Sequence, residues 1–482
     1  MSGRYVTNYV TLPDPPCRSS ALRRDGAILP ATMKLRPAIG IVIVTALIFI
    51  SGGATAQVKD PFTLALTGDS IIMQRLQVFK EPEFTKLFDL IRGADAAFTN
   101  LETLFHDYEM PPAHESGGTW MRTDPPILKE LVWAGFDLVS RANNHAGDFG
   151  VQGAQITSRY VRDAGLVEAG VGNSLSEARE AKFLETPKGR VALISAASTF
   201  TPHSRAGNTR GDMPARPGLS PLRFTTTYIV TPERLADLRR VASELSGNPP
   251  GAGDTLNFGG RRYVAGSTPG TRTEPNKQDV EEIARVVKSA SALADIVIVS
   301  LHCHESGANR SVPADFIPIF AKAVIDAGAD VFVGHGPHVL RGIEIYKGKP
   351  IFYSLSNFIF QNETVLRMPE ESYEEYSLKD DAQPADYLDA RYDKDRRSFP
   401  ADREYWDSVA VVTKWEGGRF VEAQLHPITL GFQTPRSERG RPKLASGQDA
   451  ARILEMVTTR SKAFGATVTV KNGVGIVTPT PQ

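Results

Sequence analysis

The sequence is poor in cysteine, has no excess of basic residues, and contains no apolar run as long as a membrane-spanning helix. Two cysteines in 482 residues cannot build a disulfide framework. Lysine plus arginine and aspartate plus glutamate each number 55, so the chain lacks the basic footprint of a nucleic-acid-binding protein. Internal repeats and low-complexity tracts are also absent. What is present is an ordinary globular composition, with 41% hydrophobic and 23% charged residues.

The longest apolar run lies near the N-terminus and has the features of a secretory signal peptide. It covers residues 39–50, follows Lys34 and Arg36, and precedes the small-residue motif Ala54-Thr55-Ala56. Because a membrane helix normally needs about 20 apolar residues, we expect residues 33–56 to be a signal peptide cleaved after Ala56. The expected location is periplasmic or extracellular, and an uncleaved membrane anchor is the alternative.

The residues before this segment do not fit a signal peptide, which normally begins at the N-terminus. We expect translation to start at Met33 and residues 1–32 to be a non-native or disordered extension. Cleavage removes Cys17, so that Cys303 remains alone and no internal disulfide can form. It also removes six of the 55 basic and two of the 55 acidic residues, which leaves a net charge near −4.

From residue 62 onward, short apolar runs alternate with amphipathic segments, which is the pattern of βα units in an α/β protein. We expect a largely parallel sheet that is covered on both faces. The expected strands are Phe62–Leu66, Ala96–Thr99, Leu138–Arg141, Val191–Ala196, Ile296–Leu301 and Val331–Val333. The expected helices are Glu83–Ile91, Ile127–Ala134, Gln152–Ala164, Lys277–Ala292 and Ala314–Ala327.

The pattern changes after Ile343, where a hairpin and two later strands are expected to form a second sheet stacked on the first. Glycine, proline or charge dominates three other stretches, which we expect to be surface insertions around a site. The strands are Ile343–Tyr346, Ile351–Ser354, Val409–Lys414 and Arg419–Leu425, and the insertions are 201–221, 245–275 and 362–405. We expect one domain over 57–435, with a C-terminal helix and strands over 436–482 packed on it.

Polar motifs follow five of the six expected strands, directly where each strand ends. Ligands of open α/β sheets bind at the carboxyl ends of the strands, so we expect these motifs to share a site. They are Thr67-Gly68-Asp69-Ser70, Asn100-Leu101-Glu102, Asn143-Asn144-His145 with Asp148, His302-Cys303-His304-Glu305 and Gly334-His335-Gly336-Pro337-His338. Five of the nine histidines lie in three of these motifs. Imidazole together with carboxylate and amide oxygens is a ligand set suited to Zn, Mn or Fe.

Each motif taken alone also has a purely structural interpretation. Asp69 can cap the next helix, and Asn143 or Asn144 can hold a turn. Asp148 can orient His145 or cap the helix that follows it. His304 and Glu305 can support metal ligands from behind instead of binding metal themselves. The collection of motifs therefore indicates a metal site more strongly than any one of them does.

The motifs in order, together with Tyr353-Ser354-Leu355-Ser356-Asn357-Phe358, resemble the CapA family over about residues 62–360. CapA-like proteins are associated with synthesis, export or anchoring of a poly-γ-glutamate capsule. Their domain is similar to calcineurin-like metallophosphatases, which implies a four-layer α/β/β/α sandwich with helices outside two sheets. The resemblance also implies one or two divalent ions, with His338 as a less certain ligand. The implied ligands are Asp69, Glu102, Asn144, His145, His302 and His335.

The sequence departs from the metallophosphatase pattern at two ligand positions. Ile71 stands where the Asp-x-His opening has a histidine, and Glu102 stands where the bridging carboxylate is an aspartate. One of the two metal positions is therefore expected to be weak, empty or differently built. Within the CapA pattern, Ser356 stands where a glycine is expected, which affects the geometry of that turn.

These residues predict a metal-dependent hydrolase in which metal-activated water attacks a phosphoester or γ-glutamyl bond. Proton transfer is expected from a side chain near the metals, and binding of an anionic substrate from groups close to the motifs. The candidates for proton transfer are His304, His338 and Asp148, and those for substrate binding are Arg141, Arg341 and Asn357. For the two arginines, ordinary salt bridging is an equally good interpretation.

Two other functions remain open at this point. One is a non-catalytic capsule component that binds the anionic polymer or contacts membrane-bound capsule synthase subunits, and the missing histidine at Ile71 favours it. The other is an amide hydrolase that cuts or transfers the polymer. The sequence therefore favours an enzyme without deciding the question.

Overall fold

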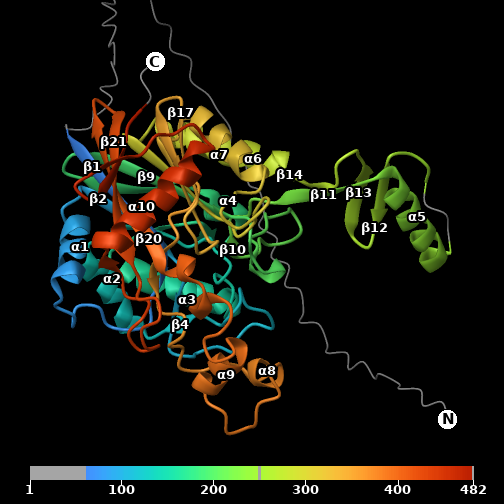
Figure 1. Ribbon diagram of the computed structural model, residues 1–482, viewed down its shortest axis with the longest axis horizontal. Helices are drawn as coiled ribbons and strands as arrows, with labels where there is room; N and C mark the ends of the chain where they lie inside the picture. The colour runs from blue at the N-terminus through green and yellow to red at the C-terminus, as the bar shows by residue number, and fades with distance from the viewer. Residues whose placement is uncertain (1–60, 248–250, 480–482) are drawn as a thin grey trace, which may run out of the picture. The chain divides into compact units, whose positions relative to one another are not determined.

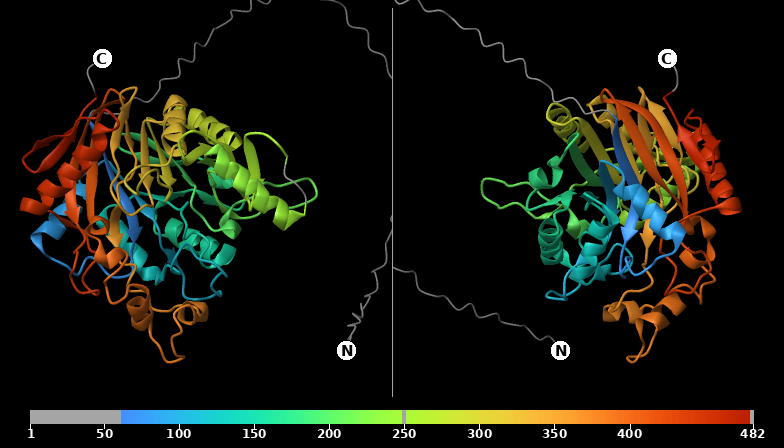
Figure 2. Two further views of the ribbon diagram at one scale, coloured as in Figure 1. Left: turned by 45° about the vertical axis from the view of Figure 1, so that its right-hand side comes forward. Right: turned by 90° about the vertical axis from the view of Figure 1, so that its left-hand side faces the viewer.

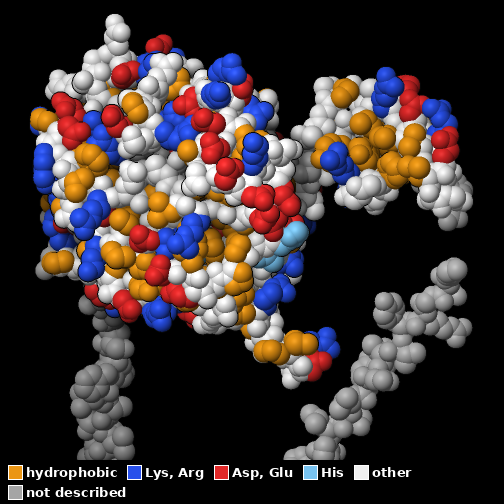
Figure 3. All heavy atoms as spheres, turned by 90° about the horizontal axis from the view of Figure 1, so that it is seen from below, with side chains coloured by type: hydrophobic (Ala, Val, Ile, Leu, Met, Phe, Trp, Pro, Cys, Tyr) orange, Lys and Arg blue, Asp and Glu red, His pale blue; other side chains and the backbone are white. Residues whose placement is uncertain are grey.

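The computed structural model describes residues 61–247 and 251–479 (Figure 1). The predicted signal peptide at 33–56 and the predicted extension at 1–32 lie outside the described residues. Within the described residues, every helix is too short or too polar to cross a membrane. On the face seen from below in Figure 3, basic, acidic and apolar side chains are interspersed, which agrees with the balanced charge of the sequence.

The larger of the two main sheets contains the first three expected strands. Its strand order is β23-β24-β21-β20-β1-β2-β5-β6, with β19 paired to β1 and β22 paired to β21. Parallel pairing joins β19, β1, β2, β5 and β6, whereas β20, β21 and β24 pair antiparallel. The strands are β1 Phe62–Ile71, β2 Ala96–Leu101, β5 Leu138–Ser140, β6 Val167–Ala169, β19 Asn357–Phe360, β20 Asp407–Glu416, β21 Arg419–Thr429, β22 Lys443–Leu444, β23 Thr469–Lys471 and β24 Val474–Val477.

The second main sheet has the order β17-β18-β16-β15-β9-β8 and contains the other three expected strands. Its central strands β9, β15, β16 and β18 are parallel, and β8 and β17 pair antiparallel at the two edges. The strands are β8 Lys182–Thr186, β9 Gly189–Ala197, β15 Ile296–His302, β16 Val331–His335, β17 Ile343–Tyr346 and β18 Lys349–Phe352.

The predicted α/β class is confirmed, but the assignment of strands to sheets differs from the expectation. The six expected strands do not share one sheet, because three belong to each. The hairpin β17–β18 extends the sheet of β16, and β20–β21 extends the sheet of β1. The physical reason is that β1, β2, β9 and β15 are apolar on both faces, and such strands look alike in sequence whether a helix or another sheet covers them.

Buried apolar side chains fill the space between the two sheets and cover their other faces. Leu64, Phe98, Leu193 and Ile298, from strands of both sheets, lie in one core cluster. The other face of the larger sheet packs against α1 and α2, and the other face of the second sheet packs against α6 and α7 (Figures 1 and 2). The bounds of these four helices are α1 Pro82–Arg92, α2 Leu128–Ala134, α6 Lys277–Ser291 and α7 Phe316–Asp326. A further helix, α3, covers Gly150–Asp163.

One of the three expected insertions forms a small sheet together with a strand that precedes it. Strands β12, β13 and β14 in 245–275 pair with β11 in the order β12-β13-β11-β14, preceded by α5. The hairpin between β12 and β13 has the two-residue loop Gly259-Gly260, and both glycines adopt the positive φ that such a tight turn requires. The bounds are β11 Phe224–Val230, α5 Pro232–Ser246, β12 Thr255–Phe258, β13 Arg261–Ala265 and β14 Gly270–Pro275.

The other two insertions contain short elements. The 362–405 insertion holds two short helices and two turns of 3-10 helix, and 201–221 holds β10, which pairs with β7. The C-terminal region contributes α10, the edge strand β23 and the adjacent strand β24 of the larger sheet. The remaining bounds are α8 Glu370–Glu374, α9 Pro384–Arg391, α10 Gly447–Lys462, α4 Leu175–Arg179, β3 Leu104–Phe105, β4 Arg122–Thr123, β7 Val171–Gly172 and β10 Gly218–Leu219.

Candidate metal centre

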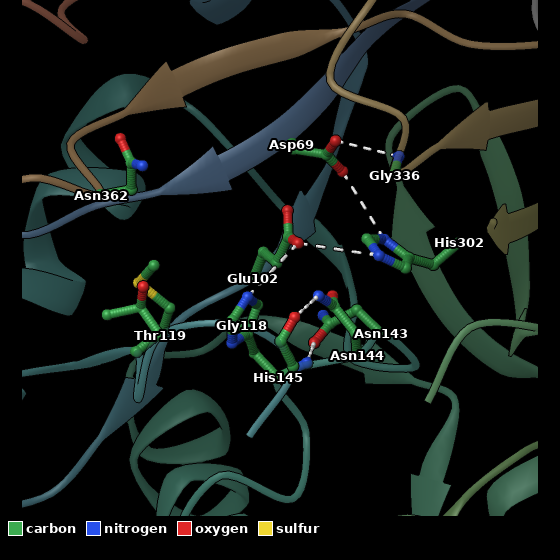
Figure 4. Close-up of polar contacts among 12 residues, drawn as sticks. Asp69, Glu102, Gly118, Thr119, Asn143, Asn144, His145, His302, Gly336 and Asn362 are labelled. Atoms are coloured by element: carbon green, nitrogen blue, oxygen red, sulfur yellow. Dashed lines mark hydrogen bonds and ion pairs between the residues drawn. The ribbon is translucent and has the colours of Figure 1, made fainter. Parts of the chain in front are cut away.

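The carboxyl ends of strands from both sheets bring the predicted polar motifs together. Asp69 lies near the end of β1, Glu102 directly follows β2, and His302 is the last residue of β15. Their side chains point toward one another in Figure 4. In the second sheet His302 is paired in register with His335, the last residue of β16. All four side chains are completely buried.

Asp69, His302 and His335 form the first ligand group, with ligand atoms within 4.8 Å of one another. Oδ1 of Asp69 lies 3.4 Å from Nδ1 of His335 and 3.7 Å from Nδ1 of His302. The two Nδ1 atoms are 3.1 Å apart. Nε2 of His335 contacts Oγ of Ser300 at 2.6 Å, and such a contact on the far nitrogen orients a ligating imidazole.

Glu102, His304 and His338 form a second ligand group under the same criterion. Nε2 of His304 lies 3.0 Å from Nε2 of His302, so the two groups adjoin. Oε1 of Glu102 lies 3.7 Å from Nε2 of His302 and 3.9 Å from Nε2 of His145. Glu102 is therefore placed where one carboxylate can reach ligands of both groups.

The surroundings of the buried Glu102 oxygens show whether these residues fit a cation. Neither Oε1 nor Oε2 has a hydrogen-bond partner among the described residues, and Oδ1 of Asn144 is buried without one as well. A buried carboxylate without a partner is strongly unfavourable, and a divalent cation would satisfy it. Because all donors are nitrogen or oxygen, they fit Zn, Mn or Fe.

The pKa values favour the protonation states that bind metal, except at Glu102. Burial alone would raise the pKa of Asp69, but hydrogen bonds with His335 and His338 hold it well below its ordinary value. Burial lowers the pKa of His302 well below its ordinary value and that of His304 to about 3. Burial, followed by repulsion from Asp69, raises the pKa of Glu102 well above its ordinary value. A cation beside Glu102 would reverse that shift.

His145 is held in place by Asp148. Nδ1 of His145 lies 2.6 Å from Oδ2 of Asp148. The carboxylate also accepts hydrogen bonds from the backbone N–H groups of Gly117, at 2.9 Å, and Met121, at 2.8 Å. Asp148 is thus fully engaged behind His145, and it leaves Nε2 of His145 directed toward Glu102.

Asn357 and Ser356 hold His338 from the other side. Oδ1 of Asn357 lies 2.8 Å from Nδ1 of His338, and its Nδ2 donates to the carbonyl of Tyr405 at 2.9 Å. Oγ of Ser356 donates to the carbonyl of His338 at 3.0 Å. Ser356 has a φ of 61°, so the serine adopts the left-handed conformation that a glycine would adopt without strain. The carbonyl of Ser356 would lie 1.8 Å from a Cβ at Gly68, which excludes any side chain there.

A cavity of about 320 Å³ borders the ligand groups. His145, His304 and His338 line it on one side, and Asn144 also reaches it. Ile71 forms part of the wall, so an apolar side chain stands where the metallophosphatase pattern has a histidine. Among the described residues, none of the side chains that line this cavity is acidic.

The two arginines expected to bind substrate do not line the cavity. Arg141 is buried, with Nη1 3.6 Å from Oε2 of Glu168. Arg341 is also buried, and its Nη2 donates to the carbonyl of Glu305 at 2.7 Å. Instead, Arg310 and Arg391 line the cavity. Neither arginine is predicted from the sequence, because neither follows a predicted strand.

Comparisons with known proteins agree with the resemblance in the sequence. The family model described as "Bacterial capsule synthesis protein PGA_cap" matches residues 63–362. The chain is 38% identical over 446 residues to the uncharacterized protein y4sH of Sinorhizobium fredii, covering 89% of this chain and 95% of that protein. It is 27% identical to the "PGA biosynthesis protein CapA" of Bacillus subtilis, covering 67% of this chain and 71% of that protein. For the "Capsule biosynthesis protein CapA" of Bacillus anthracis the identity is 24% and both coverages are 71%.

Among solved structures, the NAD nucleotidase of Haemophilus influenzae aligns with a TM-score of 0.28 and 8% identity. The alignment covers 83% of this chain and 56% of that enzyme, so the chain spans about half of its length. A score this low supports no inference about the fold or the activity.

Proposed function

The chain belongs to the bacterial capsule synthesis protein family, and we propose that it acts there as a metal-dependent hydrolase. The observation that carries this proposal is the buried carboxylate of Glu102, whose oxygens have no hydrogen-bond partner among the residues described. Glu102 belongs to one histidine-containing ligand group and lies 3.7 Å from His302 of the other. Helices on the outer faces of two packed sheets support a further proposal, that the fold is the four-layer sandwich of calcineurin-like metallophosphatases.

We assign one divalent ion to Asp69, His302 and His335, and a second ion to Glu102, His304 and His338. Asn144, with its unpartnered Oδ1, and His145 complete the set. Mn, Zn or Fe would suit these nitrogen and oxygen donors. When bound, such ions supply a nucleophile from water near neutral pH and neutralise charge on a phosphoryl or acyl oxygen.

The protein side chains around the cavity have separate tasks in this proposal. His145 and His338 line the cavity, and each has one ring nitrogen fixed by a neighbouring oxygen. The other nitrogen of each ring can serve either as a metal ligand or as a proton donor to a leaving group, but not as both, so whichever of the two imidazoles is not bound to metal is the proton donor. Asp148 and Asn357 act as positioning residues for these two imidazoles.

The substrate in this proposal is a phosphoester or a γ-glutamyl bond of an anionic polymer. The printed names of two relatives, which refer to PGA and capsule biosynthesis, favour the polymer. The ligand set, which is like that of metallophosphatases, favours the phosphoester. We further propose that the protein is exported and that membrane-bound capsule synthase subunits are its partners.

The test begins with the metal content of the purified full-length protein. Bound metal is measured by mass spectrometry, and hydrolysis of bis-p-nitrophenyl phosphate and of poly-γ-glutamate is then followed with added Mn, Zn or Fe. We expect turnover of one substrate, with loss of both metal and turnover in Asp69→Ala and His335→Ala. Protein that stays metal-free and inactive with every ion would refute the enzyme, and turnover that survives both substitutions would refute the site.

The alternative is a non-catalytic component that keeps the metals but only binds polymer. The observation in its favour is Ile71, which places an apolar wall at the position of an expected histidine ligand. Stoichiometric metal together with polymer binding, and no cleavage of either substrate, would select this alternative.

A further inference from the structure

Arg391 brings a positive charge from the end of α9 to the wall of the cavity. Its Nη1 donates to Oη of Tyr387 at 2.6 Å, to Oγ1 of Thr119 at 2.8 Å and to the carbonyl of Gly118 at 3.2 Å. Among the described residues, no acceptor contacts its Nε or Nη2. One nitrogen therefore fixes the guanidinium, and the other two keep their hydrogens for a further acceptor.

The charge of Arg391 is not neutralised, in contrast to that of its neighbour Arg310. Arg310 forms ion pairs with Asp402 and with Glu404, the latter at 3.3 Å. Within the described residues, Arg391 has no carboxylate partner, and its guanidinium lies 5.8 Å and 5.7 Å from the ring centroids of Tyr387 and Tyr392. Aromatic rings stabilise a guanidinium without occupying its hydrogen-bond donors. A half-buried cation in a cavity without acidic side chains attracts an anion.

The helix that carries Arg391 is held by ion pairs to the loop after β21. Nη2 of Arg436 lies 2.9 Å from Oδ1 of Asp389 in α9 and 3.1 Å from Oδ1 of Asp395. Arg439 pairs with Asp395 at 2.8 Å and also with Glu363, close to the cavity residue Asn362. Several charges on one network hold a segment better than isolated pairs do. Arg391 is therefore presented from a fixed position, which favours a binding role.

We propose that Arg391 binds an anionic group of the substrate that is separate from the bond being cleaved. Two adjacent donors, Nε and Nη2, suit the two oxygens of a carboxylate or a phosphate. Ile71, Phe360 and Phe399 in the same wall suit methylene groups. A γ-linked glutamate chain has both features, since each residue carries an α-carboxylate separated from the γ-amide by two methylene groups. This choice of substrate class rests on the proposed function, but the anion site itself does not require catalysis.

The test is binding to the full-length protein in EDTA, so that neither metal nor turnover contributes. Isothermal titration calorimetry measures the Kd of γ-linked tetraglutamate, of the same tetramer with α-amides, and of glycerol 3-phosphate. We expect Arg391→Gln to weaken binding of the preferred anion about 10-fold or more, and Arg391→Lys to weaken it less. Arg396→Gln is the matched control, because Arg396 lies in the same segment, pairs with Asp393 at 2.6 Å and does not line the cavity.

The pattern of Kd values distinguishes the sources of the anion and can overturn the proposal. Preference for tetraglutamate, lost in its α-amide form to the level of Arg391→Gln, supports a carboxylate, and preference for glycerol 3-phosphate supports a phosphate. Equal Kd values for wild type and Arg391→Gln, or no binding of any ligand by wild type, would refute the site. Melting temperatures check that α9 remains folded. Because no hydrolysis is measured, failure here leaves the hydrolase proposal standing, and an inactive protein that binds through Arg391 leaves this inference standing.

Discussion

The two ligand groups differ in how well the protein satisfies their carboxylates. Asp69 in the first group accepts hydrogen bonds from Nδ2 of Asn100, at 2.8 Å, and from the N–H of Gly336, at 2.9 Å. Glu102 in the second group is equally buried, but within the part of the chain that the structure describes neither of its oxygens has a hydrogen-bond partner. Burial would raise the pKa of Asp69, but hydrogen bonds with His335 and His338 hold it well below its ordinary value, whereas burial raises the pKa of Glu102 well above its ordinary value. The first group is thus prepared in the absence of metal, whereas the second depends on a cation.

Asp69→Ala is expected to have the largest effect on metal binding and turnover. It removes the one carboxylate of the first group, which also contacts His338 of the second at 3.4 Å. We expect both bound metal and turnover to fall by more than the roughly 10- to 100-fold typical of changes behind the ligands. Metal analysis and kcat/KM measure the effect. Asp212→Ala, which removes an exposed carboxylate paired with Arg210, is the control and should change neither quantity.

Glu102→Gln separates the two groups, because it removes the negative charge of a carboxylate that has no hydrogen-bond partner among the described residues. We expect one ion per chain to remain in place of two. In EDTA the variant should be more stable than wild type, by up to about 1–3 kcal/mol for a buried group without a partner. Asp69→Asn should be destabilised instead, since its amide would meet the donors of Asn100 or Gly336. Urea unfolding measures the stability of both variants. A Glu102→Gln variant less stable than wild type would show that the Glu102 carboxylate is satisfied without metal.

Asn357→Ala tests the second group without removing any of its ligands. Asn357 fixes Nδ1 of His338 at 2.8 Å without belonging to either ligand group. We expect metal affinity of the second group to fall about 10-fold, within the range for residues that orient a ligand, with the first group unchanged. Competition with a fluorescent chelator measures the two affinities. Equal loss at both groups would show that they do not behave separately.

The ligands at strand ends could be predicted because each lies next to an apolar run in the sequence. Contacts between residues far apart in the chain could not be predicted in this way. Asp69, Glu102 and His302 each follow or end an apolar run, and the runs are buried strands in the structure. No sequence pattern indicated which strands belong to which of the two sheets. Arg391 lies in a short helix within an insertion, and no apolar periodicity of the sequence predicted this residue as part of a site. Arg141 was selected for its place beside a motif, yet its side chain pairs with Glu168.

The smallest expected effect is the pH dependence of the free energy of unfolding of the metal-free protein. It tests directly how Asp69 and Glu102 differ. Because the folded state raises the pKa of Glu102 above its ordinary value of 4.5, folding favours the protonated carboxyl. That contribution to the free energy of unfolding is fully present below pH 4.5 and is lost as pH rises through the folded-state pKa. Asp69 has the opposite sign, because its lowered pKa gives a contribution that is lost as pH falls below its ordinary value of 3.8.

The two contributions can be separated by subtracting a variant from the wild type in EDTA. The difference in stability between wild type and Glu102→Gln should widen in favour of the variant as pH rises above 4.5, since glutamine does not titrate. Added Mn or Zn should abolish this trend, because a cation stabilises the ionised carboxylate. Urea unfolding at several pH values measures it. A difference that is constant with pH would mean that Glu102 has a partner in the metal-free state, and the contrast between the two groups would then disappear.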